Sequence, residues 1–167
     1  MELVSDDGAR FALTVVGYEF PDVEALAAAD PDAEPDEDDL NWLVVRGDVT
    51  TADGAHWSFE DGCLTAWEAA DLGAWLRAVA DDVPADVTDA WLDGGRITFT
   101  EPALAFDLAD TTPGAGRVAV RVTLAAEALP PDAARAAHVT VTLVTAGDAL
   151  AAAAVRWTRE LARYPPR

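Results

Sequence analysis

Residues 41–80 read NWLVVRGDVTTADGAHWSFEDGCLTAWEAADLGAWLRAVA, and this stretch predicts two strands, a hairpin and a helix. From Trp42 to Val49, apolar and mixed residues alternate, which is typical of a half-buried strand. The Asp-Gly pair at 53–54 suits a tight turn, because glycine adopts positive φ without strain, and a second strand follows at 56–59. Four of the six tryptophans lie in this stretch, so much of the aromatic core is expected to assemble here.

The predicted helix begins at a capping-box sequence formed by Thr65 and Glu68. The hydroxyl and the carboxylate can each satisfy a free amide at the start of a helix. Apolar residues then recur at helical spacing and predict a stripe that packs on a sheet: Leu72, Trp75, Leu76 and Val79. Asp71 and Arg77 lie off this stripe, and we expect both to face water.

The rest of the chain repeats the strand pattern and ends in a second helix. Alternation occurs near 10–20, 96–100, 103–108, 118–124 and 139–143, and the last helix begins near Asp148 as its N-cap. Half-buried strands of this kind form antiparallel sheets. The sequence therefore predicts one α+β domain over residues 1–167, with an antiparallel sheet or sandwich of six to seven strands and two amphipathic helices. Trp91 and Leu92 are expected to pack onto its core.

The charge of the chain is strongly unbalanced. Acidic residues number 31 against 11 basic ones, all of them arginine, and the formal net charge is −20. Nine acidic residues and no basic one lie at 22–40, and this composition predicts an acidic flexible loop at 30–40. The field should repel nucleic acid and anionic membranes and attract a basic protein partner. GC-biased coding or a salty cytoplasm explains the same composition, so both interpretations stay open.

No group of residues in the sequence has the spacing of a metal centre. Acidic residues alternate at 30–36, but Pro35 and Asn41 stand where a calcium loop needs glycine and glutamate. His56 and His138 have no partner at the ligand spacing of zinc sites. We therefore expect no bound metal and no cofactor.

Cys63 is the single cysteine of the chain, and we expect it to be a small core residue rather than a nucleophile. A hydrolase would need this thiol, or a carboxylate pair, exposed in a pocket beside a base, and a ligand-binding domain would need a concave apolar pocket. The sequence favours neither, so no enzymatic activity is expected. With neither a signal peptide nor an apolar run of membrane length, the protein is expected to be cytoplasmic.

Four segments of the sequence resemble the WapI-type immunity protein family. They are NWLVV at 41–45, WSFEDGCL at 57–64 leading into WE and LGAWL before residue 77, FTEPALAF at 99–106, and ELARYPPR at 160–167. The likeness spans nearly the whole chain. Two features depart from the family pattern, namely Ala103 where a polar residue is common and the long acidic insert before Asn41.

The resemblance implies a cytoplasmic immunity protein that binds and blocks a contact-delivered toxin domain, a basic nuclease of the tRNase type. An acidic inhibitor suits this target because it can occlude a basic RNA-binding face. We expect the partner-binding residues to be the carboxylates Asp32, Glu34, Asp36, Glu37, Asp38, Asp39, Glu60 and Asp61. The alternative is a small non-catalytic ligand-binding or interaction domain with a generically acidic surface.

Overall fold

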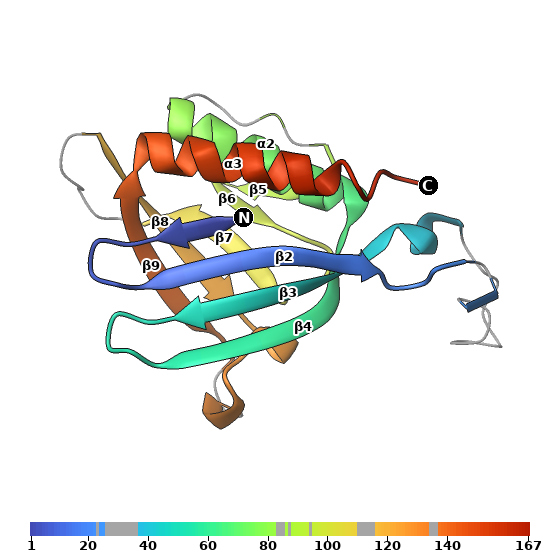
Figure 1. The fold of residues 1–167 in the computed structure, drawn as a ribbon, viewed down its shortest axis with the longest axis horizontal. Coiled ribbons are helices and arrows are strands. Elements are labelled where there is room, and N and C mark those ends of the chain that lie inside the picture. Colours follow the sequence, from blue (N-terminus) through green and yellow to red (C-terminus); the bar gives the residue numbers. More distant parts are fainter. Residues whose placement is uncertain are drawn as a thin grey trace.

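The computed structural model describes residues 1–22, 24–25, 37–82, 86, 88–93, 95–109, 116–133 and 137–167. Within these ranges the chain forms two antiparallel sheets and the α-helices α2 and α3 (Figure 1). The predicted α+β class, the antiparallel pairing and the two helices are therefore confirmed. Of the predicted acidic loop, residues 30–36 lie outside the described ranges, and Glu37–Asn41 form the 3-10 helix η1.

The first sheet has the strand order β1-β2-β3-β4. Its strands are β1 (Glu2–Val4), β2 (Arg10–Tyr18), β3 (Trp42–Thr50) and β4 (His56–Thr65). The predicted hairpin joins β3 to β4, with Gly54 at φ +89°. Strand β4 extends beyond the predicted 56–59, because pairing to β3 continues after the alternation of side chains stops. Glu60 and Asp61 therefore lie in a strand, beyond the predicted end of that strand at residue 59.

The second sheet has the strand order β5-β6-β7-β8-β9. Its strands are β5 (Trp91–Asp93), β6 (Arg96–Thr98), β7 (Leu104–Leu108), β8 (Arg117–Leu124) and β9 (Val139–Ala146). The predicted total of six to seven strands is wrong, because the described residues form nine strands in two sheets. The sequence pattern missed β1 and β5, whose three residues each are too few to show an alternation.

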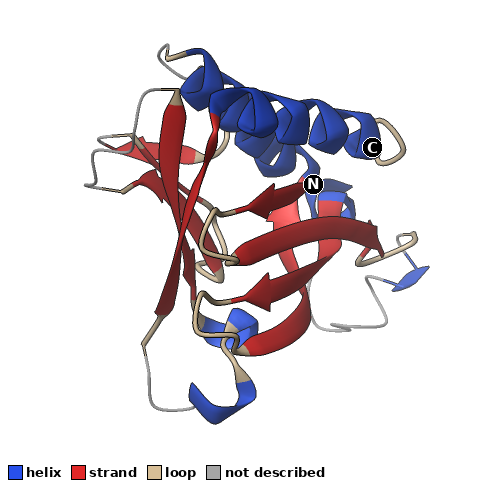
Figure 2. Ribbon diagram, turned by 60° about the vertical axis from the view of Figure 1, so that its left-hand side comes forward, coloured by secondary structure: helices blue, strands red, loops and turns tan. Residues whose placement is uncertain are grey.

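The two sheets face each other, and the helices lie side by side across one end of them (Figures 1 and 2). These helices are α2 (Ala66–Asp81) and α3 (Gly147–Leu161). The Trp157 indole N–H donates to the Ala69 carbonyl oxygen at 2.7 Å and so joins them. Neither helix, in the described part of the chain, is long and apolar enough to cross a membrane.

Phe106 on β7 lies at the centre of the aromatic core. Its ring meets that of Phe11 from the opposite sheet edge-on, with centroids 5.7 Å apart, and it contacts the rings of Trp75 and Phe99 at 6.2 and 6.3 Å. Edge-to-face contacts of this kind stabilise a core beyond the area that they bury. Phe106 therefore connects both sheets with helix α2.

The tryptophans differ in how deeply they are buried. Trp57 and Trp75 are buried, as predicted, and their indole N–H groups donate to the carbonyl oxygens of Ala128 and Gly95. Trp42 and Trp67 are only half-buried. Trp91 is 70% exposed and Leu92 42% exposed, so the prediction that these two pack on the core was wrong. Both lie on β5, an edge strand of the second sheet.

Helix α2 begins with the predicted capping box. The Glu68 amide donates to the Thr65 hydroxyl at 3.1 Å, and the Thr65 amide donates to Glu68 Oε2 at 3.0 Å. The other carboxylate oxygen, Oε1, accepts from the Thr100 amide at 2.6 Å. Glu68 is buried, so one carboxylate fixes the helix start and the turn that leads to β7.

Asp71 was predicted to face water, but the structure buries it. Its carboxylate accepts hydrogen bonds from the backbone amides of Thr88, Asp89 and Ala90 at 2.6–3.1 Å. These bonds replace the water that the carboxylate loses on burial. The predicted N-cap role of Asp148 was also wrong, since α3 has Ala146 as N-cap and no side-chain cap.

We predict that Glu68→Ala destabilises the fold by about 2–4 kcal/mol, because it removes a helix cap and leaves the Thr100 amide without its acceptor. Urea denaturation of the variant and the parent protein measures this loss. Glu68→Gln keeps one acceptor oxygen and should cost less. A loss below about 1 kcal/mol for the alanine variant would show that the carboxylate does not hold these elements together.

Candidate functional site

The eight carboxylates predicted to bind a partner fall into two groups. Three lie outside the described residues: Asp32, Glu34 and Asp36. Glu37, Asp38 and Asp39 lie in η1, where Asp39 is half-buried. Glu60 is exposed and Asp61 half-buried on β4. Of the described ones, Asp61 lies closest to other carboxylates from distant parts of the chain, Glu19 and Glu127.

Asp61 lies beside a β-bulge in β4. The register advances two residues on β4 for one on β3, which leaves Cys63 as the extra residue. A bulge of this kind bends a strand and redirects its side chains. A Cβ atom added at Gly62 would lie 2.7 Å from Glu19 Oε2. Glycine at 62 therefore allows the Glu19 carboxylate to lie against the bulge, beside Asp61.

Four carboxylates from distant parts of the chain lie in the neighbourhood of this bulge. Glu19 follows β2, Asp61 lies on β4, Glu101 precedes β7, and Glu127 lies in the 3-10 helix η2 (Ala126–Ala128). Glu19 is within electrostatic range of Asp61 and Glu101, and Asp61 is within range of Glu127. We call these four residues the carboxylate cluster.

The carboxylates of the cluster carry charges of the same sign, and these charges repel one another. Burial raises the pKa of Glu19 above its usual range, and the charges of Asp61 and Glu101 raise it further. Burial is likewise the main cause of the raised pKa of Asp61, with the charge of Glu127 adding to it. Each shift means that the folded protein resists the charged form. A cation placed among these groups would relieve that repulsion.

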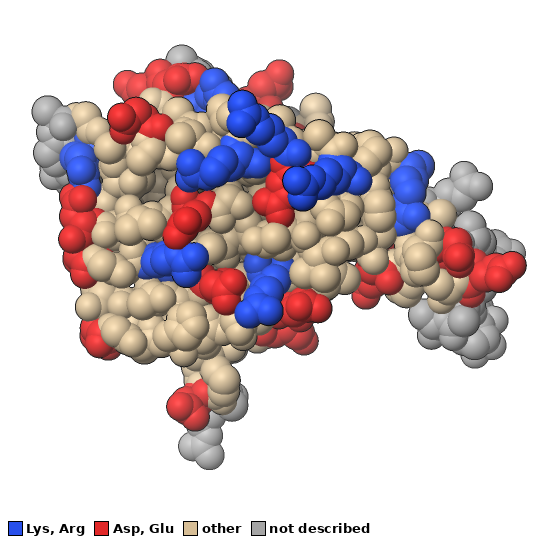
Figure 3. Space-filling model, viewed as in Figure 1, with Lys and Arg blue, Asp and Glu red and all other residues tan. Residues whose placement is uncertain are grey.

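No basic side chain of the described residues forms an ion pair with the carboxylate cluster. The ion pairs of these ranges use other carboxylates, those of Glu2, Asp6, Asp48, Asp107 and Glu160. On the face seen in Figure 3, the arginine side chains gather mainly along α3. Nor do the described His, Cys, Asp and Glu residues form a group of three that could hold a metal ion. The arrangement is suited to a basic side chain from another molecule.

The C-terminal residues hold both ends of the acidic segment close to this site. The Arg167 guanidinium donates to the carbonyl oxygens of Phe20, Pro21 and Leu40, each at 2.7 Å. It also lies 3.6 Å from the centroid of the Tyr18 ring. Asn41, which is buried, donates to the Arg167 carbonyl oxygen and accepts from its amide. The ends of the segment at 22–40 are thereby held beside Glu19.

Cys63 lies at the bulge and is fully buried, as predicted. Burial raises the pKa of its thiol strongly, and the charges of Asp61, Glu101 and Glu68 raise it further. Only the thiolate is a good nucleophile. His56 begins β4 at the hairpin end, where it is hydrogen-bonded to the Thr50 hydroxyl at 3.2 Å, whereas Cys63 lies near the other end of the strand, so His56 does not serve this thiol as a base. The geometry around Cys63 supports a structural role.

Sequence reasoning missed Glu19, Glu101 and Glu127 as members of the site. Glu101 stands in the FTEPALAF segment that carries part of the family resemblance, so that motif was a usable signal. Glu19 and Glu127 belong to no motif. They come to Asp61 only because β2 is joined through β3 to β4, and because the Trp57 indole on β4 binds the Ala128 carbonyl oxygen of η2.

We predict that a maleimide or disulfide reagent labels native Cys63 very slowly, because the thiol is buried and its pKa is raised. Mass spectrometry with and without denaturant measures the label. Ser58→Cys provides a matched control, since Ser58 is exposed on the same strand, and it should react rapidly in the native protein. Rapid labelling of native Cys63 would contradict the structural role.

We predict that Glu19→Gln raises the melting temperature near pH 7 by up to about 3 °C. Glu19 is exposed, so solvent screening keeps the effect small. Its pKa is raised on folding, and the stability from that shift is present below the unfolded pKa and lost as pH rises through the folded pKa. Calorimetry should therefore find the gain near pH 7 and almost none near pH 3. Glu60→Gln is the matched control, and an equal gain there would contradict local repulsion at Glu19.

Comparisons with known proteins place the chain in a family. Searches of the curated proteins and of solved structures found no match. The model of the immunity protein WapI-like family matches residues 2–165. This range includes both sheets, both helices and all four members of the carboxylate cluster. Because the match covers nearly the whole sequence, the chain belongs to the immunity protein WapI-like family.

Proposed function

We propose that this immunity protein neutralises a toxin domain that has a basic surface, and that it captures this domain with the carboxylate cluster and the acidic segment beside it. The observation that carries the proposal is the set of four carboxylates around Asp61, two of them with raised pKa and none paired with a described basic residue. Membership of an immunity family supplies the class of partner.

The physical basis of capture is the relief of repulsion. Carboxylates near one another, with Asp61 half-buried among them, cost free energy while no cation is near. An arginine or lysine of the toxin, placed among Glu19, Asp61 and Glu101, would form charge-assisted hydrogen bonds and remove that cost. The net charge of −20 adds long-range attraction, which can raise association rates by ~10–10³-fold at low salt.

The toxin activity that best fits this surface is a nuclease, specifically one that cleaves tRNA. A nuclease must present a basic face to bind RNA. An acidic inhibitor that covers this face excludes the substrate without any chemistry of its own. We therefore propose inhibition by occlusion in the cytoplasm, with no catalytic activity and no cofactor in the immunity protein.

The proposed partner-binding surface combines the carboxylate cluster with the residues expected from the sequence. The residues expected from the sequence are Asp32, Glu34, Asp36, Glu37, Asp38, Asp39, Glu60 and Asp61. The clamp formed by Arg167 on the carbonyl oxygens at 20, 21 and 40 supports this combination, because it holds the ends of the acidic segment near Glu19. Fixing the two ends of a binding segment lowers the entropy that it loses on binding.

We predict that Glu60→Gln/Asp61→Asn slows association with the cognate toxin domain about 3–10-fold at low salt and flattens its salt dependence. A neighbouring reading frame that encodes a large secreted protein with a short basic C-terminal domain would supply this toxin domain. Stopped-flow fluorescence over a range of salt concentrations measures the rate, and a tRNA cleavage assay measures inhibition. A second variant neutralises the acidic segment at Asp36, Glu37, Asp38 and Asp39.

The control variant is Asp81→Asn/Asp132→Asn, which removes the same charge at exposed positions on α2 and on η3 (Pro131–Ala133). It should change the rate much less, because steering depends on where charge lies as well as on its sum. If the control slows association as much as the variant at 60–61, the effect is one of net charge and the proposed surface is wrong. Failure of the native protein to bind the toxin would favour an interaction domain with another partner.

A further inference from the structure

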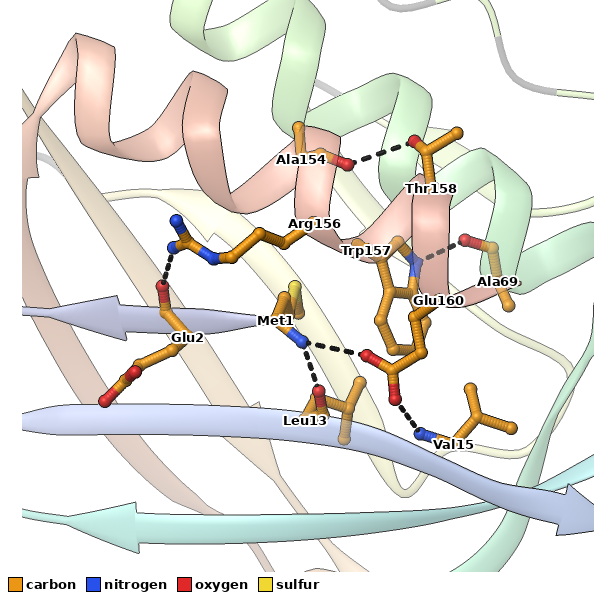
Figure 4. Close-up of polar contacts among 10 residues, drawn as sticks. All are labelled: Met1, Glu2, Leu13, Val15, Ala69, Ala154, Arg156, Trp157, Thr158 and Glu160. Carbon is orange, nitrogen blue, oxygen red and sulfur yellow. Dashed lines mark hydrogen bonds and ion pairs between the residues drawn. The ribbon is translucent and has the colours of Figure 1, made fainter. Parts of the chain in front are cut away.

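Three carboxylates of the two helices point away from the outer surface of the helix pair. On α2, Glu68 and Asp71 are buried and bound to backbone amides. On α3, the Glu160 carboxylate accepts from the Val15 amide at 2.8 Å and lies 3.4 Å from the amino group of Met1, so it points toward the sheets (Figure 4). These three carboxylates are thus unable to neutralise basic side chains on the outer surface of the helices.

The exposed carboxylates of the two helices lie at one end of the pair. Asp81 ends α2 and Asp148 lies in the first turn of α3, and both are exposed. These helix ends are neighbours, because Ala80 and Gly147 line the same pocket. The remaining outer surface of the helix pair therefore has no exposed acidic residue among its described side chains.

Arginines occupy this outer surface. Arg77 on α2 and Arg156, Arg159 and Arg163 on and after α3 are all exposed, and we call these four the arginine face. Arg156 donates to the Glu2 carbonyl oxygen at 3.2 Å (Figure 4). The other three form no ion pair with any described residue. A chain with 31 acidic and 11 basic residues thus carries one local surface of the opposite sign.

A groove crosses the arginine face between the helices. It has a volume of about 330 Å³ and is lined by Arg77, Val155, Thr158, Arg159 and Ala162. Apart from the arginines its lining side chains are small, and one lining arginine comes from each helix. The guanidinium group presents several donors in a planar fork that matches a carboxylate. The groove can therefore receive a small apolar side chain flanked by acidic ones.

We propose that the arginine face binds an acidic polypeptide segment, with its carboxylates on Arg77 and Arg159 and an apolar side chain over Val155. This surface is distinct from the carboxylate cluster, and the proposal does not depend on the toxin partner. We choose an acidic segment as the occupant because its carboxylates complement the positive charge of the arginine face. This face is a local basic surface on a chain of net charge −20. At physiological salt the Debye length is about 8 Å, so a segment bound here is screened from most of the distant acidic residues.

Other anionic macromolecules fit the arginine face less well. Binding of single-stranded RNA relies on aromatic side chains on which bases stack, and the groove has none among its lining residues. An interfacial membrane helix needs large apolar residues such as Trp, Phe or Leu on its buried side, whereas the groove has Val155 and Ala162. The small apolar floor flanked by arginines is a better match for a peptide.

The test uses a short fluorescein-labelled peptide of alternating glutamate and leucine, followed by fluorescence anisotropy at about 20 mM and about 200 mM salt. The native protein should bind this peptide at low salt, and Arg77→Gln/Arg159→Gln should weaken the binding about tenfold, the loss of one or two charge-assisted contacts. Both side chains are exposed, so the fold should survive, and a thermal melt checks this.

The matched control is Arg10→Gln/Arg46→Gln, which removes the same charge from the first sheet, where both arginines already have acidic partners. It should leave peptide binding within about twofold of the native value. A lysine–leucine peptide should bind the native protein and the Arg77→Gln/Arg159→Gln variant alike. Failure of the native protein to bind the glutamate peptide, or equal loss in the control, overturns the proposal. Binding of an RNA oligonucleotide or of phosphatidylglycerol vesicles that depends on these arginines, without peptide binding, overturns it as well.

Discussion

The arrangement of the elements depends on the hydrogen bonds that the buried carboxylate of Glu68 accepts. One oxygen accepts from the Thr65 amide at the start of α2, and the other accepts from the Thr100 amide ahead of β7. Because α2 follows β4 directly, this single group connects the first sheet, the helix layer and the second sheet. A carboxylate so deeply buried is tolerated only when backbone donors replace its water. Phe106 then fills the space between the connected elements.

The need of a carboxylate for hydrogen-bond donors or water also distinguishes the other acidic residues that the structure describes. Carboxylates on the inner side of the helices are satisfied by backbone amides, as at Asp71 and Glu160. Those around the bulge of β4 have one another as neighbours, and their pKa values rise at Glu19 and Asp61. The outer side of the helices carries exposed arginines. A sequence with an average charge of one sign thus folds into surfaces of both signs, for which we propose different partners.

Much of the fold could be predicted from local patterns in the sequence, whereas the candidate site could not. The capping box at Thr65 and Glu68, the hairpin at 53–54 and the burial of Cys63 each depend on neighbouring residues, and the structure has all three. Of the carboxylates in the cluster, only Asp61 was expected at a binding site. Glu19 and Glu127 are far from it in sequence, and no spacing rule relates residues on strands that are paired through a third.

The sequence by itself determined the fold class, the two helices and an acidic chain, because periodicity and composition are local properties. The tertiary structure alone decided the division into two sheets, the burial of Asp71 and the exposure of Trp91. Asp71 lies off the apolar stripe of α2, yet the amides of residues 88–90 turn toward it and make burial favourable. Whether a polar side chain is buried depends on donors brought from elsewhere in the chain, and that information exists only once the elements have packed.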